Sequence, residues 1–139
     1  MNYEILKGKC RVTTKLNLKH RQILADRDAV IEALGNLISN SVEYSLRNKN
    51  LTVRTFSQGK YSCVSVKDSG IGIPKDDLPR VFEPFFRAKN STNVRPGGTG
   101  LGLSVVKNVM DAHHGQIEIE SEPGYGTKIT LLFTSMEKK

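Results

Sequence analysis

Residues 95–104 read Arg-Pro-Gly-Gly-Thr-Gly-Leu-Gly-Leu-Ser, and this glycine-rich stretch runs directly into a segment with helical apolar periodicity. A loop that folds closely around a bulky anion needs residues without a Cβ atom. A helix that begins behind the loop supplies unpaired N–H groups and the positive end of its dipole. The stretch therefore predicts a phosphate-binding loop, although glycine clusters also form turns and flexible linkers.

The length and composition are those of one globular domain. The chain has 139 residues, 37% of them hydrophobic, without an apolar run of membrane-spanning length or a signal-peptide pattern. Cys10 and Cys63 match no metal-ligand spacing, which favours reduced thiols over a disulfide. The net charge of +7 comes from scattered Lys and Arg residues without interleaved aromatic residues. We therefore expect solvated surface rather than nucleic-acid binding.

The apolar spacing predicts two long helices and several strands. Asp26 is typical of an N-cap, and apolar residues recur at intervals of three and four from Arg27 to about Ser45. A short helix is expected over 74–80 and a second long helix over 101–113, ended by Gly115. The β-prone stretches are 11–16, 23–24, 51–56, 61–67, 116–121 and 127–133. This order predicts an α+β fold, a two-layer sandwich with helices on one face of a mixed, mostly antiparallel sheet.

A row of polar side chains is predicted along the first helix. Asn36, Asn40 and Glu43 stand at i, i+4 and i+7, so they share a face while the apolar residues point into the core. Asparagine prefers caps and turns to helix interiors, which makes this row unusual. One interpretation is a solvated polar face. The other is that the side-chain oxygen of Asn40 ligates a magnesium ion whose other ligands are water and phosphate.

Residues 68–74, Asp-Ser-Gly-Ile-Gly-Ile-Pro, directly follow a predicted strand. The glycines would let a flat ligand approach the backbone, and the carboxylate of Asp68 could accept a hydrogen bond from an exocyclic amine. Adenine carries such an amine where guanine carries an acceptor. The alternative is an ordinary Asp-Ser-Gly turn, which the two glycines around Ile71 make less comfortable.

These elements follow one another as an Asn-x-x-x-Asn helix, Asp-x-Gly-x-Gly, Phe-Glu-Pro-Phe-Phe-Arg and Gly-x-Gly-x-Gly. The order resembles the ATP-binding catalytic domain of sensor histidine kinases over residues 20–133, essentially the whole chain. In the family's terms, residues 36–45 resemble the N box, 68–72 the G1 box, 82–86 the F box and 98–102 the G2 box, and 124–127 resemble a further glycine turn. Each motif alone is weak, but four in the right order on the predicted elements argue against coincidence.

The resemblance implies the Bergerat, or GHKL, fold, with MgATP held between the helices under a mobile lid at residues 87–99. Asn40 would ligate Mg²⁺, Asp68 would bind the adenine amine and Arg87 would approach the γ-phosphate. Asn40 and Arg87 are the catalytic candidates, because phosphoryl transfer depends mainly on positioning and charge neutralisation. The residues implied to bind the nucleotide are Asn36, Asn40, Tyr44, Asp68, Gly70, Gly72, Ile73, Arg87, Gly98, Thr99, Gly100, Leu101, Gly102, Leu103 and Thr127.

One residue departs from the family pattern. Many members carry a lysine or another phosphate-facing base where this chain has Glu43. A carboxylate there would repel the triphosphate unless it turns away or meets a cation. Arg87, Lys89 or Arg95 could compensate for it.

The family phosphorylates a histidine on a separate helical domain, and neither His20 nor the pair His113 and His114 lies in the sequence setting of such an acceptor. We expect residues 1–10 to be a linker remnant, 11–135 the catalytic domain and 136–139 a C-terminal tail. The implied partners are ATP or ADP, the histidine-bearing dimerisation domain of the same protein and, indirectly, a response regulator. We expect a cytoplasmic monomer that contacts neither nucleic acid nor membrane, whether or not the full-length protein is membrane-anchored.

Three other functions stay open. Topoisomerase and mismatch-repair ATPases share the fold but place a glutamate one turn before the metal-binding asparagine to activate water. Asn36 stands at that position here, which disfavours hydrolysis. A protein-serine kinase of the anti-sigma type shares the phosphate cradle, although residues 82–87 fit a sensor kinase better. A degenerate nucleotide-binding or docking module without transfer activity is the last alternative, and Glu43 favours it.

Overall fold

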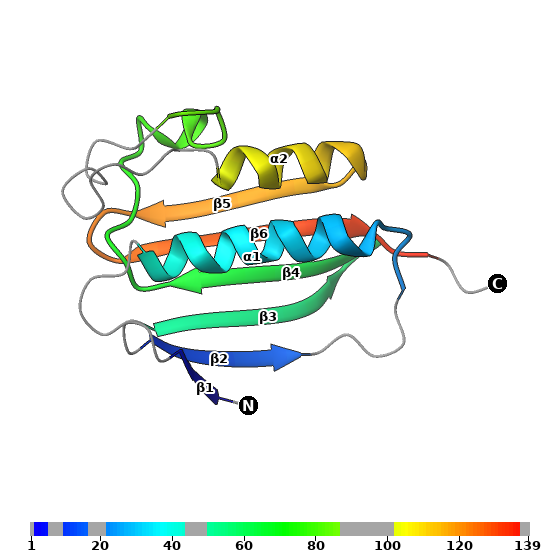
Figure 1. Cartoon of the computed structure of the whole chain (residues 1–139), viewed down its shortest axis with the longest axis horizontal. Coiled ribbons are helices and arrows are strands. Elements are labelled where there is room, and N and C mark those ends of the chain that lie inside the picture. Colours follow the sequence, from blue (N-terminus) through cyan, green and yellow to red (C-terminus); the bar gives the residue numbers. More distant parts are fainter. Residues whose placement is uncertain (1, 6–9, 17–21, 44–49, 87–101, 137–139) are drawn as a thin grey trace.

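The computed structural model describes residues 2–5, 10–16, 22–43, 50–86 and 102–136. These residues form a six-stranded sheet with both long helices on one of its faces (Figure 1). The layered α+β sandwich predicted from the sequence is therefore confirmed.

The strands are ordered β1-β2-β3-β4-β6-β5 across the sheet. Among the described strands, only β2 and β3 are parallel to each other, and every other neighbouring pair is antiparallel. The sheet is thus mixed and mostly antiparallel, as expected. The strands are β1 (Asn2–Ile5), β2 (Cys10–Leu16), β3 (Asn50–Gln58), β4 (Tyr61–Asp68), β5 (Gln116–Glu122) and β6 (Gly126–Thr134).

The strand β1 was not predicted, because it lies in the stretch expected to be linker. It pairs antiparallel with β2 and extends the sheet at its edge. The division of the chain into linker, domain and tail stays a prediction. Ile23, expected in a short strand, makes an isolated antiparallel bridge to Ser135 beyond the end of β6.

The helix α1 (Arg27–Glu43) begins where the sequence predicts. Asp26 caps it, because its carboxylate oxygen accepts a hydrogen bond of 3.1 Å from the N–H group of Ala29. The second helix, α2 (Gly102–Ala112), packs beside α1 on the same face of the sheet (Figure 1). The short helix expected over 74–80 is reduced to turns followed by the 3₁₀ helix η1 (Leu78–Arg80).

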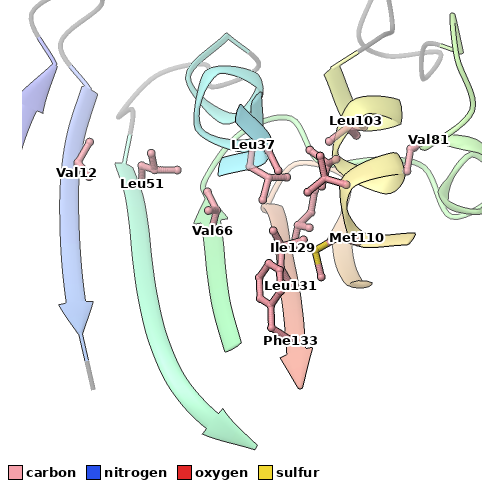
Figure 2. Close-up of a cluster of buried hydrophobic side chains, with 13 residues drawn as sticks. Val12, Leu37, Leu51, Val66, Val81, Leu103, Met110, Ile129, Leu131 and Phe133 are labelled. Carbon is pink, nitrogen blue, oxygen red and sulfur yellow. The ribbon is translucent and has the colours of Figure 1, made fainter. Parts of the chain in front are cut away.

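The core lies between the two helices and the sheet (Figure 2). Leu37 of α1 and Met110 of α2 are buried against side chains from the central strands. Residues alternate along a strand, so every second side chain of β4 and β6 points toward the helices. The buried hydrophobic residues that β4 and β6 contribute to this face are Val66, Ile129, Leu131 and Phe133. The last residue on the helix-facing side of β4 is Asp68.

The helix α2 ends before Gly115, as expected, but the residue in the left-handed conformation is not this glycine. His114 takes the left-handed conformation, with φ of 53°, and the N–H group of Gly115 bonds to the Met110 carbonyl at 2.9 Å. Gly115 is required for another reason. A Cβ atom on it would collide with the Met110 side chain and the Leu132 carbonyl oxygen.

His113 joins the end of α2 to the start of α1. Its Nε2 atom accepts a hydrogen bond of 2.9 Å from the backbone N–H group of Asp26. Its Nδ1 atom lies 2.7 Å from the carbonyl oxygen of Val109, and this nitrogen carries the proton because Nε2 is an acceptor. The ring also meets Phe133 edge-on, with centroids 6.2 Å apart. The imidazole therefore fixes the two helices to each other at the end of the fold away from the start of α2.

Candidate nucleotide-binding site

Asp68 is held by three different parts of the fold. It ends β4 on the side of the sheet that faces the helices. Its Oδ1 atom accepts hydrogen bonds from the N–H groups of Gly70, at 2.9 Å, and of Thr127 in β6, at 3.1 Å. The hydroxyl of Ser41 in α1 also donates to the carboxylate. With two backbone donors on Oδ1, the carboxylate is oriented before any ligand binds.

Burial raises the pKa of Asp68 above the usual value for aspartate. The hydrogen bonds from Gly70, Ser41 and Thr127 act in the opposite direction, because they stabilise the charged form, but they do not cancel the loss of hydration. A carboxylate kept in a desolvated place at a strand end is the kind of group that functional sites use to recognise a ligand.

Two glycines around Asp68 have no room for a side chain. Gly72 has a φ of 72°, and a Cβ atom there would collide with the backbone of Glu122 and Pro123. Gly126 has a φ of 126°, and a Cβ atom there would collide with the carbonyl group of Asp68. The N–H group of Gly124 also donates to the Ile71 carbonyl at 2.8 Å. The loop after β4 and the turn between β5 and β6 are therefore packed backbone against backbone.

The structure adds Ser121 of β5 to this region, a residue that the sequence analysis missed. Its Oγ atom accepts a hydrogen bond of 2.8 Å from the N–H group of Ile73 and donates one of 3.0 Å to the carbonyl oxygen of Gly126. The same atom lies 2.7 Å from the hydroxyl oxygen of Thr127. No sequence motif singles out this serine, since its partners come together only when the loop and the hairpin have folded.

The two asparagines of α1 behave differently. The Nδ2 atom of Asn36 donates to the Glu32 carbonyl at 3.1 Å, one turn earlier in the helix. Its Oδ1 atom faces the start of α2, because a Cβ atom added at Gly102 would lie 3.7 Å from it. Asn40 lies one turn further along the same face and is half-buried. Asn36 and Asp68 thus both lie at the interface where α1 meets the other elements of the predicted site.

Besides Asn40, the predicted site residues that the structure describes fall into two groups. Asp68, Gly70, Gly72, Ile73 and Thr127 are brought together where β4 ends and β6 begins. The start of α2 brings Gly102 beside Asn36, while Leu103 is buried in the core. The remaining predicted site residues lie outside the described residues: Tyr44, Arg87, Gly98, Thr99, Gly100 and Leu101. So do Lys89, Arg95 and the whole of the lid expected at residues 87–99, and nothing is described of the Glu43 side chain.

The phenylalanine-rich segment at 82–86 packs on the core at its two ends only. Phe82 and Phe86 contact the core, and the Arg80 guanidinium lies 4.6 Å above the ring of Phe86. Phe85 is 74% exposed and has a φ of 65°, which is unusual for a residue with a bulky side chain.

The described parts of the chain contain no group of three or more His, Cys, Asp or Glu residues that could hold a metal ion by themselves. None of their helices has both the length and the apolar character needed to cross a membrane.

Comparison with known proteins identifies the family. The family model described as "Histidine kinase-, DNA gyrase B-, and HSP90-like ATPase" matches residues 25–137. The chain belongs to this family. Within the family its relatives are sensor kinases. SenX3, a sensor-like histidine kinase of Mycolicibacterium smegmatis, is 40% identical over 120 residues, which are 86% of this chain and 31% of SenX3. The sensor histidine kinase YkoH of Bacillus subtilis is 37% identical over 112 residues, which are 81% of this chain and 24% of YkoH.

Solved structures of this ATPase family have the same fold. The mycobacterial sensor histidine kinase MprB superimposes with a TM-score of 0.77 at 25% identity, over 91% of this chain and 86% of that one. The nucleotide-free catalytic domain of the histidine kinase ThkA gives a TM-score of 0.74 at 27% identity, over 88% and 78% of the two chains. The chain is thus an ATP-binding catalytic domain of the sensor histidine kinase type, and it spans less than a third of the curated relatives SenX3 and YkoH.

Proposed function

We propose that this domain binds MgATP and transfers the γ-phosphoryl group to a histidine on a separate domain. The observation that carries the proposal is the pre-oriented carboxylate of Asp68, which the backbone of β6 and the loop after β4 hold on the helix-facing side of the sheet. A fixed, desolvated acceptor suits the exocyclic amine of adenine. The start of α2, beside Asn36, is suited to the phosphates, because free N–H groups at a helix start attract anions.

Asn40 is our candidate ligand for magnesium. Its carboxamide offers a neutral oxygen on the same helix face as Asn36, which suits a cation whose other ligands are water and phosphate oxygens. When bound, the ion would neutralise charge on the phosphates. Arg87 would add a second positive charge near the transferred group, and Gly98 and Gly100 would line the phosphates.

A hydrolytic function is less well supported. Asn36 stands one turn before Asn40, where a water-activating carboxylate would be needed, and its amide is already hydrogen-bonded to the helix backbone. An amide cannot accept a proton from water at neutral pH, so phosphate would have to pass to a better nucleophile. A module that docks without transferring phosphate would bind the nucleotide but leave an added histidine domain unmodified.

The partners follow from this chemistry. The acceptor would be the histidine-bearing dimerisation domain of the same protein, and a response regulator would receive the phosphate from it. We place the reaction in the cytoplasm, where ATP is available.

The decisive experiment measures nucleotide affinity with and without magnesium, and then transfer of labelled phosphate to a supplied histidine domain. Asn40→Leu should remove the magnesium-dependent part of ATP affinity, whereas Asn40→Asp should retain some of it. Asn108→Leu is the matched control, since Asn108 is exposed on α2 away from α1's asparagine face. An unchanged magnesium effect in Asn40→Leu would move the metal to other residues. ATP binding without any transfer would favour the docking module.

A further inference from the structure

The hydroxyl of Ser121 takes part in three hydrogen bonds at the edge of the proposed adenine site, where β4 ends and β6 begins. It lies against the N–H group of Ile73, the carbonyl oxygen of Gly126 and the hydroxyl of Thr127. A serine hydroxyl has one hydrogen to donate and two lone pairs that accept. The N–H group of Ile73 can only donate, and the carbonyl of Gly126 can only accept.

These constraints decide the direction of the remaining bond. If Ser121 gives its hydrogen to Gly126, it accepts from Ile73 with one lone pair and from Thr127 with the other, and all three contacts are satisfied. If Ser121 instead gives its hydrogen to Thr127, the Gly126 carbonyl loses this donor and one serine lone pair stays unused. Only the first arrangement satisfies every contact, and in it the hydrogen of the Thr127 hydroxyl is committed to Ser121.

The consequence reaches the ligand through Thr127. Ser121 and Thr127 are directly paired across β5 and β6, on the same side of the sheet as Asp68. The backbone N–H group of Thr127 bonds to Asp68, so the two residues lie side by side. With its hydrogen used, the Thr127 hydroxyl can only accept, and the carboxylate beside it also accepts.

We propose that Ser121 is a positioning residue that fixes the Thr127 hydroxyl as an acceptor and so makes the site select a purine with an amine at position six. This inference rests on the proposed nucleotide-binding function. A purine with a carbonyl oxygen at that position would meet two acceptors and no donor. Without Ser121, the Thr127 hydroxyl is free to rotate and donate to that oxygen, so discrimination weakens.

The test compares dissociation constants for ATP and for inosine triphosphate, which has a carbonyl in place of the amine. Ser121→Ala should reduce the preference for ATP by about fivefold, mainly through tighter binding of inosine triphosphate, since one hydrogen bond is worth about 1 kcal/mol. Ser121→Thr keeps the hydroxyl and should keep the preference. Ser62→Ala is the matched control, because it also removes a hydrogen bond between two hydroxyl groups, the 2.5 Å contact of Ser62 with Ser135. This contact lies at the opposite end of β4 from Asp68.

Thr127→Val separates positioning from simple support of the fold. It should lower ATP affinity without improving inosine triphosphate, and adding Ser121→Ala to it should change the preference no further. Equal weakening of both nucleotides in Ser121→Ala, an unchanged preference, or additive effects of the two substitutions would overturn the inference. If Ser121→Ala does not fold, loss of the preference in Ser121→Thr or its retention in Thr127→Val would overturn it. A parent chain that binds neither nucleotide refutes the proposed nucleotide binding, whereas one that binds both equally refutes the role of Ser121 together with the recognition of the amine by Asp68, but leaves nucleotide binding itself standing.

Discussion

Asp68 carries its charge where water reaches it poorly. Burial raises its pKa, and three protein donors only partly offset the effect. Because both backbone donors bond to Oδ1, the second carboxylate oxygen differs from the first in what it can offer a ligand. A single side chain thus links β4 to β6 through Oδ1 and also takes the hydrogen of the Ser41 hydroxyl, while a carboxylate has further lone pairs for a ligand.

As the pH is lowered, adenosine binding should begin to weaken at a higher pH than it would if Asp68 had the pKa of an ordinary aspartate. The ionised carboxylate accepts from the adenine amine, and protonation places a hydrogen on one of its oxygens. Since the pKa of Asp68 is above the usual value of about 3.9, affinity should fall as the pH is lowered through that raised pKa. Calorimetric titration with adenosine checks this, because adenosine has no phosphate that titrates. An affinity that stays level until the pH of an ordinary aspartate would contradict the prediction.

Asp68→Asn is the companion variant. Its Oδ1 can keep both backbone donors, but its Nδ2 group would face the adenine amine donor to donor, costing about 1.5–3 kcal/mol of binding. In the parent the folded-state pKa is above the unfolded one, so the folded state holds the proton more tightly and stability falls as pH rises through this window. The variant should lose that part of the pH dependence, as urea unfolding across the acidic range would show.

Sequence reasoning found Asp68 because its motif is local, but it could not find Ser121. The partners of that serine are at positions 73, 126 and 127, and nothing in the isolated strand indicates that they converge. Asn36 was predicted on the correct helix face, yet its bond to the Glu32 carbonyl depends on a rotamer that spacing does not determine.

At the scale of elements, the link through His113 ties the two helices together. The imidazole satisfies the N–H group of Asp26, which itself caps α1, and a carbonyl at the end of α2. Pairs of helix termini are weak points, since their backbone groups lack partners within the helix. One side chain therefore stabilises the end of one helix and the beginning of the other.

His113→Ala should lower the free energy of unfolding by about 1–2 kcal/mol, because the Asp26 N–H group loses its acceptor and the edge contact with Phe133 is lost. Urea unfolding at neutral pH measures this from the shift in midpoint at constant slope. The control is His114→Asn, next along the chain, where asparagine tolerates the left-handed conformation. Equal destabilisation by both changes would show that the ring's bonds to Asp26 and Val109 contribute nothing specific.

The two long helices and five of the six described strands could be predicted from apolar spacing, to within one or two residues. The edge strand β1 could not, since four residues in a polar, lysine-containing stretch carry no clear alternation. The end of α2 was predicted for the wrong reason. In sequence, Gly115 is typical of a left-handed helix cap. In the structure, glycine is needed there because a side chain would collide with Met110 and Leu132, and the left-handed residue is His114.

At the scale of the whole molecule, the two long helices lie on one face of the sheet, and the strand register places cations on the other (Figure 1). Lys15 is paired directly with Arg54 across β2 and β3, and Lys67 with Lys128 across β4 and β6. Like charges that face each other across a sheet are destabilising. The repulsion at Lys128 is partly offset by an ion pair of 3.7 Å with Glu120 of β5.

Lys67→Glu should therefore stabilise the protein, by about 0.2–1 kcal/mol, because it turns a repulsive cross-strand pair into an attractive one. The gain should shrink at high salt, since the residues are solvent-exposed or partly so. Lys75→Glu makes the same change of net charge on an exposed loop residue outside the strands and serves as control. Thermal melts at low and high salt measure both; a gain of the same size in Lys75→Glu would assign the effect to net charge alone.

The close backbone contacts at Gly72 and Gly126 hold the two walls of the proposed adenine site, the loop after β4 and the turn between β5 and β6, against each other. Its walls are assembled as the sheet forms, so the entropic cost of ordering them is met during folding and not when a nucleotide arrives. Contacts between these walls and a base should then contribute to affinity with little loss to the entropy of ordering the protein. The base of a nucleotide is therefore recognised by groups that are already in position when it first binds. This recognition does not depend on the protein contacts that later form around the phosphates.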